Sequence, residues 1–327
     1  MNIGLIDVDG HNWPNLALMK ISGHHKSIGD TVTWWNGFEV YDIVYMSKIF
    51  DETYSGDMPE PLNARQIIKG GTGYVRRKND ELQYFANGSW VSSFSLNLDS
   101  CVKYLELLPS EIEHTYPDYS IYPRHTADTA FGYLTRGCPN NCPFCIVSQK
   151  EGFTTYKVAD LSEFWRGQKN IKLMDANLLA CKNHVELLEQ LIYSKSYVDF
   201  TQGLDCRRLT DKNIDLLSQI KIKEIHFAWD MQKHERAVIA GLKRYREINP
   251  RKMHGVYGTV YVLTNFDTSH EYDLFRVNTL KDMGYDPYIM IYDKPNAPQI
   301  TRDLQRWVNN RRIFRTCKSF EEYSKCR

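Results

Sequence analysis

The sequence predicts an α/β protein in which an N-terminal doubly wound, Rossmann-like domain precedes a partial (β/α)6 barrel. Three observations predict this arrangement. Strand-like and helix-like runs alternate after residue 129, the 327 residues suit about two domains, and three prolines interrupt residues 109–128. We therefore expect a first domain over residues 1–115, a linker over 116–128 and the barrel over 129–327.

The first domain begins with an apolar strand over residues 3–8, which carries Asp7. The loop 9–15 then leads to an apolar-rich helix over residues 16–28. A second buried strand is expected over residues 43–46, and the run Gly70-Gly71-Thr72-Gly73 predicts a flexible backbone segment. In a doubly wound sheet the ligand crevice lies at the carboxyl ends of the strands, so we expect it beside these loops.

The barrel is predicted from six strand-like runs separated by helical patterns. One helical face carries Ile214, Leu217 and Ile220, with Thr210 as its expected N-cap. Such repeats imply parallel strands with helices outside them, and the loops after the strands supply the site. The expected strands are residues 131–134, 171–174, 197–201, 224–229, 255–263 and 287–292.

Three cysteines lie directly after the first of these strands. Cys138, Cys142 and Cys145 occur in the run Arg-Gly-Cys-Pro-Asn-Asn-Cys-Pro-Phe-Cys, which two prolines interrupt. At spacings of four and three residues, their thiolates can converge on one soft metal centre. A 4Fe–4S cluster normally takes four protein thiolates, so three would leave one iron open to a substrate or cosubstrate.

The C-x3-C-x2-C spacing, with the aromatic Phe144 before the third cysteine, resembles the signature of radical S-adenosylmethionine (SAM) enzymes. The resemblance implies that Cys138, Cys142 and Cys145 hold a 4Fe–4S cluster whose open iron chelates SAM, and that Phe144 lies near the adenine. It further implies reductive cleavage of SAM to a 5′-deoxyadenosyl radical. A one-electron donor such as a flavodoxin or ferredoxin is then required.

Two alternatives come from other classes of protein. Cysteine clusters in intracellular chains are often zinc sites, so a zinc-binding nucleic-acid-binding module is one of them. Its fourth ligand would come from Cys181, Cys206, Cys317 or His125, but none of these stands in a second C-x2-C pair. The other alternative is a noncatalytic protein that uses an iron–sulfur cluster only as a redox or iron sensor.

Polar residues after the second expected strand are candidates for SAM binding. In the family, groups at this strand end bind the methionyl ammonium, so the resemblance implies that role for Asp175, with Asn177 beside it. The family's glycine-glycine-glutamate variant is not matched literally. Capping of the following turn is the structural alternative.

The run Thr-Gln-Gly-Leu-Asp-Cys-Arg-Arg-Leu follows the third expected strand. It resembles the corresponding segment of radical SAM proteins that carry an N-terminal cobalamin-binding-like domain. Gln202, Asp205 and Arg207 could reach the ribose, the carboxylate or the substrate, whereas an Asp205–Arg207 surface pair is the alternative. Cys206 is interpreted either as a packing residue or as a second catalytic thiol. Polar residues after later strands face the same mouth: Asp230, Asn265, Asp267 and Asp293.

A cobalamin site is a further expectation in the first domain. Asp9-x-His11 resembles the opening of the pattern D-x-H-x-x-G, in which the histidine ligates cobalt, but Pro14 stands where that pattern has glycine. Gly70-Gly71 resembles the diglycine beside the nucleotide tail of the cofactor. With cobalamin bound, methylation of an unactivated carbon is the leading reaction. Without it, the deoxyadenosyl radical abstracts hydrogen directly.

Charge and hydropathy restrict the partners. The formal net charge is +1, which excludes a uniformly basic nucleic-acid binder, but residues 302–327 hold eight Lys/Arg against three Asp/Glu. Nucleic acid is therefore a minority hypothesis, and solvation of the arginines or pairing with barrel carboxylates is the alternative. No stretch of 18 apolar residues occurs and the start does not resemble a signal peptide, so we expect a cytoplasmic enzyme without membrane contact.

Overall fold

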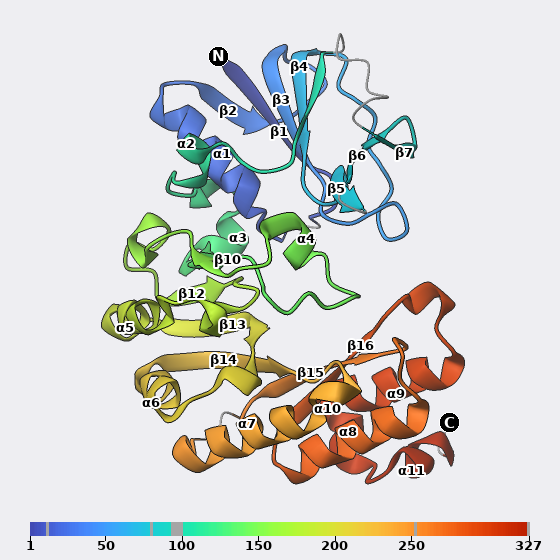
Figure 1. Ribbon diagram of the computed structural model, residues 1–327. Coiled ribbons are helices and arrows are strands. Elements are labelled where there is room, and N and C mark those ends of the chain that lie inside the picture. Colours follow the sequence, from blue (N-terminus) through green and yellow to red (C-terminus); the bar gives the residue numbers. More distant parts are fainter. Residues whose placement is uncertain (11–12, 79–80, 93–100, 252–253, 326–327) are drawn as a thin grey trace. The chain divides into compact units, whose positions relative to one another are not determined.

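The computed structural model describes residues 1–10, 13–78, 81–92, 101–251 and 254–325. The chain divides into two compact units, one of residues 1–131 with 162–166, the other of residues 132–161 with 167–327. Both are α/β structures built on parallel sheets, which confirms the predicted fold class in its coarse form (Figure 1). No described helix combines the length and apolar character needed to cross a membrane.

The first unit contains a five-stranded parallel sheet in the order β2-β1-β3-β4-β8. A separate antiparallel sheet consists of β5, β6 and β7. The elements of this unit are β1 (Asn2–Asp7), α1 (Leu16–Ser27), β2 (Thr31–Trp34), β3 (Tyr41–Ser47), β4 (Ala64–Gly70), β5 (Val75–Lys78), β6 (Glu81–Ala86), β7 (Ser89–Ser92), β8 (Val102–Leu105), α2 (Ser110–Glu113), η2 (Tyr119–Ile121) and α3 (Pro123–Thr126), followed by β9 (Thr129–Gly132), in which the division falls.

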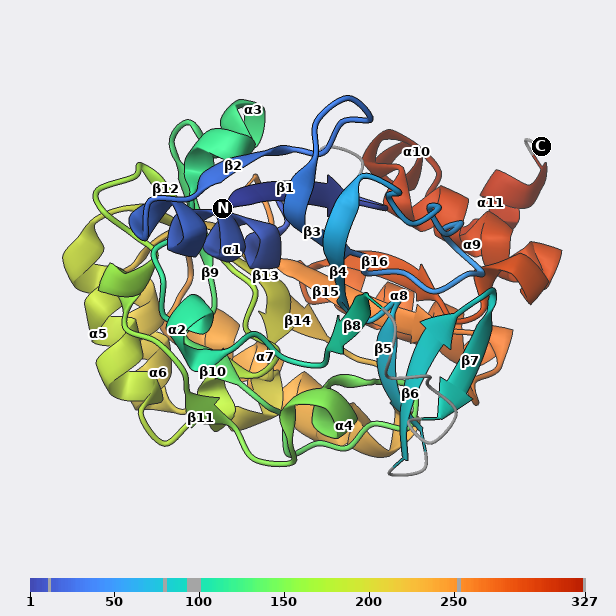
Figure 2. The same ribbon diagram turned by 90° about the horizontal axis from the view of Figure 1, so that it is seen from above.

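The parallel sheet of this unit has helices on one face only within its described residues. Leu18 and Ile21 of α1 pack with Ile112 of α2 on strand residues that include Ile3. On the opposite face, residues of β5 and β6 such as Phe85 complete a second core cluster (Figure 2). This differs from a doubly wound sheet, which has helices on both faces, because β3–β4 and β4–β8 are joined without a described helix.

Residues 116–128, the expected linker, pack on α1 within the first unit. The backbone N–H of Asp118 donates to Met19, and its carboxylate accepts from Ser22 and Lys26, each at 2.6 Å. The hydroxyl of Tyr122 donates to Asp7 at 2.5 Å. These contacts fix the segment, so it is part of a folded unit.

The second unit is built on a six-stranded sheet in the order β16-β15-β14-β13-β12-β9, which is the order of the strands along the chain. Parallel pairing runs from β12 to β16. Its elements are β10 (Thr135–Arg136), α4 (Val147–Glu151), β11 (Tyr156–Lys157), β12 (Asn170–Leu173), η4 (Leu178–Ala180), α5 (His184–Ser194), β13 (Tyr197–Leu204), η5 (Cys206–Arg208), α6 (Asp211–Gln219), β14 (Lys221–Ala228), η6 (Gln232–His234), α7 (Glu235–Ile248), β15 (Thr259–Thr264), α8 (His270–Asp282), β16 (Asp286–Ile291), η7 (Lys294–Asn296), α9 (Gln299–Asn309), α10 (Arg311–Thr316) and α11 (Phe320–Lys325), while η3 (Leu161–Glu163) lies where the chain passes between the units.

All six predicted strands are present, with shifted ends. β15 begins at Thr259, four residues later than expected, because Gly255 and Gly258 have positive φ of 89° and 152° and interrupt an extended backbone. Thr210 caps α6 as predicted, since its side chain accepts from the backbone N–H of Asn213 in a capping box.

The edge strand β16 is protected by side chains of α9. The backbone N–H of Ile289 donates to Asn309 Oδ1 at 2.8 Å, and its carbonyl accepts from Gln305 and Asn309 at 3.1 and 3.0 Å. Pro287 has no N–H to offer. The centre of the edge is therefore unable to pair with another strand.

A buried arginine joins the ends of β14 and β15. Arg276 of α8 is fully buried and donates to the carbonyls of Trp229 and Leu263 at 2.6 and 2.8 Å. It also forms an ion pair with Asp273, whose side chain is 4% exposed. This single guanidinium thus holds two strand ends beside the site described below.

We predict that Arg276→Met lowers the free energy of unfolding by about 3–5 kcal/mol, because it leaves a buried carboxylate without its partner. Urea unfolding followed by circular dichroism would measure the loss. The double variant Arg276→Met/Asp273→Leu should recover part of it, since no buried charge remains unpaired. Equal stability of the single variant and the wild type would contradict the structural role of Arg276.

Candidate functional site

The loop that carries the three cysteines is closed at its base. β10 and β11 pair antiparallel on either side of it, and the backbone N–H of Cys138 donates to Gly152 at 3.1 Å. Glu151 accepts from Arg136 at 2.8 Å and from the backbone of Gly137 at 3.0 Å. A side chain on Gly137 would lie 2.1 Å from the Thr154 carbonyl, so the Arg-Gly-Cys run requires glycine there.

Asp175 fixes the start of the same loop. Its carboxylate accepts hydrogen bonds from the backbone N–H groups of Leu134 and Thr135 and from the Thr135 hydroxyl, at 2.5 to 3.2 Å. The residue is 6% exposed, and burial raises the pKa of this carboxyl to about 6. The structure thus gives Asp175 intramolecular partners, and its predicted contact with the SAM ammonium stays a prediction.

Asn177 connects the end of β12 with the cysteine loop. Its Nδ2 lies 3.5 Å from the Sγ of Cys138 and 3.5 Å from Oδ2 of Asp205. The residue is only 2% exposed, and its Oδ1 has no hydrogen-bond partner. Asn177 therefore presents one amide donor to sulfur and one unsatisfied acceptor at the site.

Asp205 and Arg207 form a bidentate ion pair at the site. The guanidinium donates to both carboxylate oxygens, at 2.7 and 2.8 Å, and Asn140 of the cysteine loop donates to Oδ2 at 3.1 Å. The Asp205 side chain is 8% exposed, so this is not the surface pair considered as an alternative. Hydrogen bonds and charge from Arg207 hold the pKa of Asp205 below its usual range in spite of burial.

Gln202 lies in a bulge of β13. Between Phe200 and Leu204 the register to β14 shifts, and Gly203 has a positive φ of 91°. Gln202 is exposed and does not join the Asp205 network. Cys206 is 1% exposed and burial raises the pKa of its thiol, as expected for a packing cysteine.

The three cysteines are free thiols of intermediate exposure. Burial, followed by the proximity of Cys145, Asp230 and Cys138, raises the pKa of the Cys142 thiol to about 11. The three thiols are therefore close enough to interact electrostatically. Within the described ranges, however, no three His, Cys, Asp or Glu side chains are grouped closely enough to hold a metal ion.

Later strands contribute acidic and aromatic groups to this end of the sheet. Asp230 accepts from the backbone of Leu263 at 3.2 Å, and burial raises its pKa to about 6. Phe144 packs edge-on against Phe266 at 5.3 Å, and Phe266 packs on Tyr292 at 4.9 Å. An aromatic chain thus connects the cysteine loop to the ends of β15 and β16.

Two of the other candidates after these strands, Asn265 and Asp293, have structural partners. Asn265 donates to the carbonyl of Tyr292 at 2.8 Å, and Asp293 accepts from Asn296 at 3.0 and 3.1 Å. Asn265, Asp267 and Asp293 all have positive φ, between 48° and 62°. Such strained non-glycine residues are frequent near functional sites.

The predicted cobalamin residues have other roles or lie outside the description. His11 is not among the described residues. Both oxygens of Asp9 accept from the backbone of Ile49, and one also accepts from Phe50. A side chain on Gly71 would lie 2.2 Å from the carbonyl of Lys48, so this glycine permits close backbone approach. Cobalamin binding by this unit stays a prediction.

Sequence reasoning missed three residues that build the site: Asn140, Glu151 and Thr135. Asn140 stands between the first two cysteines, where a side-chain amide can reach a neighbouring strand end. The roles of Glu151 and Thr135 depend on loop closure, which has no sequence signal.

No protein-family model matches the chain, and a search of curated proteins finds no match.

The pKa of Asp175 predicts a pH dependence of stability. Because the folded state raises this pKa from 3.8 to about 6, the folded protein binds the proton more tightly than the unfolded chain. The resulting stability is complete below pH ~4 and is lost as the pH rises through 6.

We expect the wild type to lose on the order of 3 kcal/mol more than Asp175→Asn between pH 4 and pH 7, in urea unfolding at matched pH values. The Asn variant does not titrate at this position and serves as the reference. Parallel stability curves for the two proteins over this range would contradict the raised pKa.

Proposed function

We propose that this chain is a radical SAM enzyme that binds a 4Fe–4S cluster through Cys138, Cys142 and Cys145. The observation that supports it most is the three-cysteine loop, which follows the first strand of a six-stranded parallel sheet and contacts the carboxyl ends of β12 and β13. When bound, the cluster would supply one-electron chemistry at an open iron. The strand order along the sheet, which follows the sequence, also supports a partial barrel.

The donor set suits such a cluster. It consists of three reduced, partly exposed thiols. The positive charge of Arg207 favours the thiolate form of Cys142. Burial disfavours thiolates here until a cation neutralises them. Since the cysteines are not grouped as metal ligands in the described structure, the proposal includes closure of the loop tip over its fixed base.

The neighbouring residues would position the loop and the cosubstrate. Asp175 holds the first turn, while Asp205, paired with Arg207, holds Asn140. Oδ1 of Asn177 is an unsatisfied acceptor that suits an ammonium or hydroxyl of SAM. Phe144 offers a ring face for the adenine, and a flavodoxin-like or ferredoxin-like donor would deliver the electron.

Cysteine replacement tests the proposal. After anaerobic reconstitution, we expect Cys138→Ala, Cys142→Ala and Cys145→Ala to lose iron, sulfide and dithionite-dependent release of 5′-deoxyadenosine from SAM. Cys101→Ala is the control, because Cys101 is exposed and lies in the first unit. Zinc in place of iron would favour the zinc-module alternative. Iron and sulfide without 5′-deoxyadenosine would favour the sensor.

Asn177 should tune the cluster. Hydrogen bonds to cluster sulfurs raise the reduction potential, so Asn177→Ala should make the potential more negative in an EPR-monitored redox titration. Asn140→Ala is the matched control, since its amide donates to Asp205 and not to sulfur. A potential that shifts equally in both variants would mean that general loosening of the loop is the cause.

A further inference from the structure

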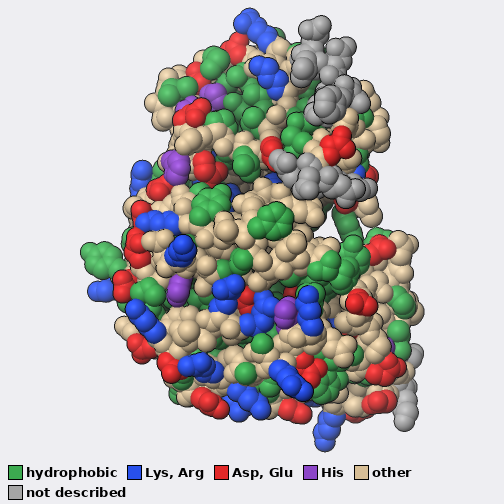
Figure 3. Space-filling view, viewed as in Figure 1, with side chains coloured by type: hydrophobic (Ala, Val, Ile, Leu, Met, Phe, Trp, Pro, Cys, Tyr) green, Lys and Arg blue, Asp and Glu red, His purple; other side chains and the backbone are tan. Residues whose placement is uncertain are grey.

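The C-terminal helices carry a concentration of positive charge. Residues 302–318 contain six Lys/Arg and one acid, Asp303, which gives +5, so the rest of a chain with net charge +1 carries −4. On the face drawn in Figure 3, by contrast, basic and acidic side chains are interspersed. The six cations are all exposed: Arg302, Arg306, Arg311, Arg312, Arg315 and Lys318.

These cations are largely without acidic partners. Among the described residues, the one ion pair found for them joins Arg311 Nε to Asp286 at 3.5 Å. Arg302 instead donates to the carbonyl of Pro295 at 2.8 Å. Pairing with barrel carboxylates, the alternative raised by the sequence, therefore does not account for the segment.

Folding alone does not explain why cations gather here. α9 buries Leu304, Trp307 and Val308, and α10 buries Phe314 against Trp307, so the core requires only the apolar positions. Arg311 and Arg315 are four residues apart on one face of α10, where like charges repel and destabilise a helix. An arrangement that costs stability in the free protein indicates an anionic partner.

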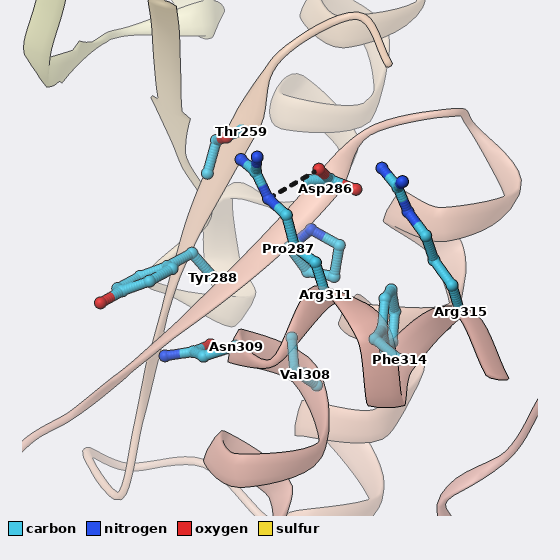
Figure 4. Close-up of a pocket in the computed structure, with 9 residues that line it drawn as sticks. All are labelled: Thr259, Asp286, Pro287, Tyr288, Val308, Asn309, Arg311, Phe314 and Arg315. Carbon is cyan, nitrogen blue, oxygen red and sulfur yellow. Dashed lines mark ion pairs between the residues drawn. The ribbon is translucent and has the colours of Figure 1, made fainter. Parts of the chain in front are cut away.

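Arg311 and Arg315 line one small cavity, which has a volume of about 30 Å³ and is partly open to solvent. Figure 4 shows both side chains extending from α10 on the same side, with Asp286 drawn between their guanidinium groups. Tyr288 also lines the cavity, its ring directed away from the arginines, and is 45% exposed. Guanidinium groups suit phosphate and an exposed aromatic ring suits a base.

The cavity lies at the starts of two strands. Thr259 and Asp286, the first residues of β15 and β16, both line it, whereas the cysteine loop contacts the carboxyl ends of strands. β15 has six residues, and at about 3.3 Å per residue its first and last residues are roughly 17 Å apart. The cavity is thus distinct from the proposed cluster site.

We propose that this cavity and the surrounding cations dock single-stranded nucleic acid. Arg311, Arg312 and Arg315 contact backbone phosphates, with Asp286 orienting Arg311, and an unpaired base stacks on Tyr288. The exposed ring is what favours a nucleic acid over other polyanions. The proposal does not depend on the presence of a cluster.

Fluorescence anisotropy with a labelled oligouridylate of about 16 nucleotides tests the docking site on the full chain. Affinity should fall steeply with salt, by about 0.7 in log–log slope for each phosphate contact. Arg311→Gln/Arg312→Gln/Arg315→Gln should therefore reduce the slope by roughly 2. The control Lys212→Gln/Arg236→Gln/Lys243→Gln removes the same charge from exposed positions on α6 and α7 and should leave the slope unchanged.

Tyr288→Leu separates nucleic acid from polyanion binding in general. It should weaken the oligouridylate about fivefold or more, since stacking on one base is lost, and leave heparin affinity unchanged. Equal weakening of both ligands would overturn the nucleic-acid assignment. Absence of salt-dependent binding by the wild type, or equal slope loss in the two triple variants, would overturn the docking site itself.

Discussion

The Asp205 carboxylate is the group on which the arrangement of the candidate site depends. It lies just beyond β13 and accepts two hydrogen bonds from the Arg207 guanidinium and one from Asn140 in the cysteine loop, and the amide of Asn177, after β12, is 3.5 Å away. Three segments that are distant in sequence thus meet at two oxygen atoms. A charge this well buried is tolerable because the guanidinium compensates it, and the same guanidinium gives the cysteine loop a cationic neighbour.

Asp175 and Asp230 illustrate the opposite balance of forces. Neither carboxylate has an ion pair in the described structure, and burial raises the pKa of each to about 6. Asp175 instead accepts hydrogen bonds from the backbone N–H groups at the start of the cysteine loop. Its position therefore matters more to the loop than its charge does. The site therefore combines one carboxylate kept ionised by an arginine with two whose ionisation is costly, and such differences are typical of functional clefts.

Features of the fold that depend on neighbouring residues in the chain could be predicted from the sequence. The Thr210 cap, the apolar face of α6 and the strand before the cysteine loop all follow from short-range patterns. Partners distant in sequence could not be predicted, because no periodicity records that Asp175 would meet Leu134 and Thr135 or that Asn140 would meet Asp205. The prediction of a linker over residues 116–128 differs from the structure for the same reason. Its prolines predicted a break in helical structure, whereas the contacts of Tyr122 and Asp118 with residues about a hundred positions earlier make it part of a folded unit.

The protected edge of β16 has a consequence for the order of folding. The groups that satisfy Ile289 belong to Gln305 and Asn309, which follow it in the chain. During synthesis, the strand is made before the helix that covers it, and its edge can pair with any other exposed strand until α9 forms. Formation of α9 thus ends the interval in which the exposed edge of β16 makes the nascent chain vulnerable to aggregation.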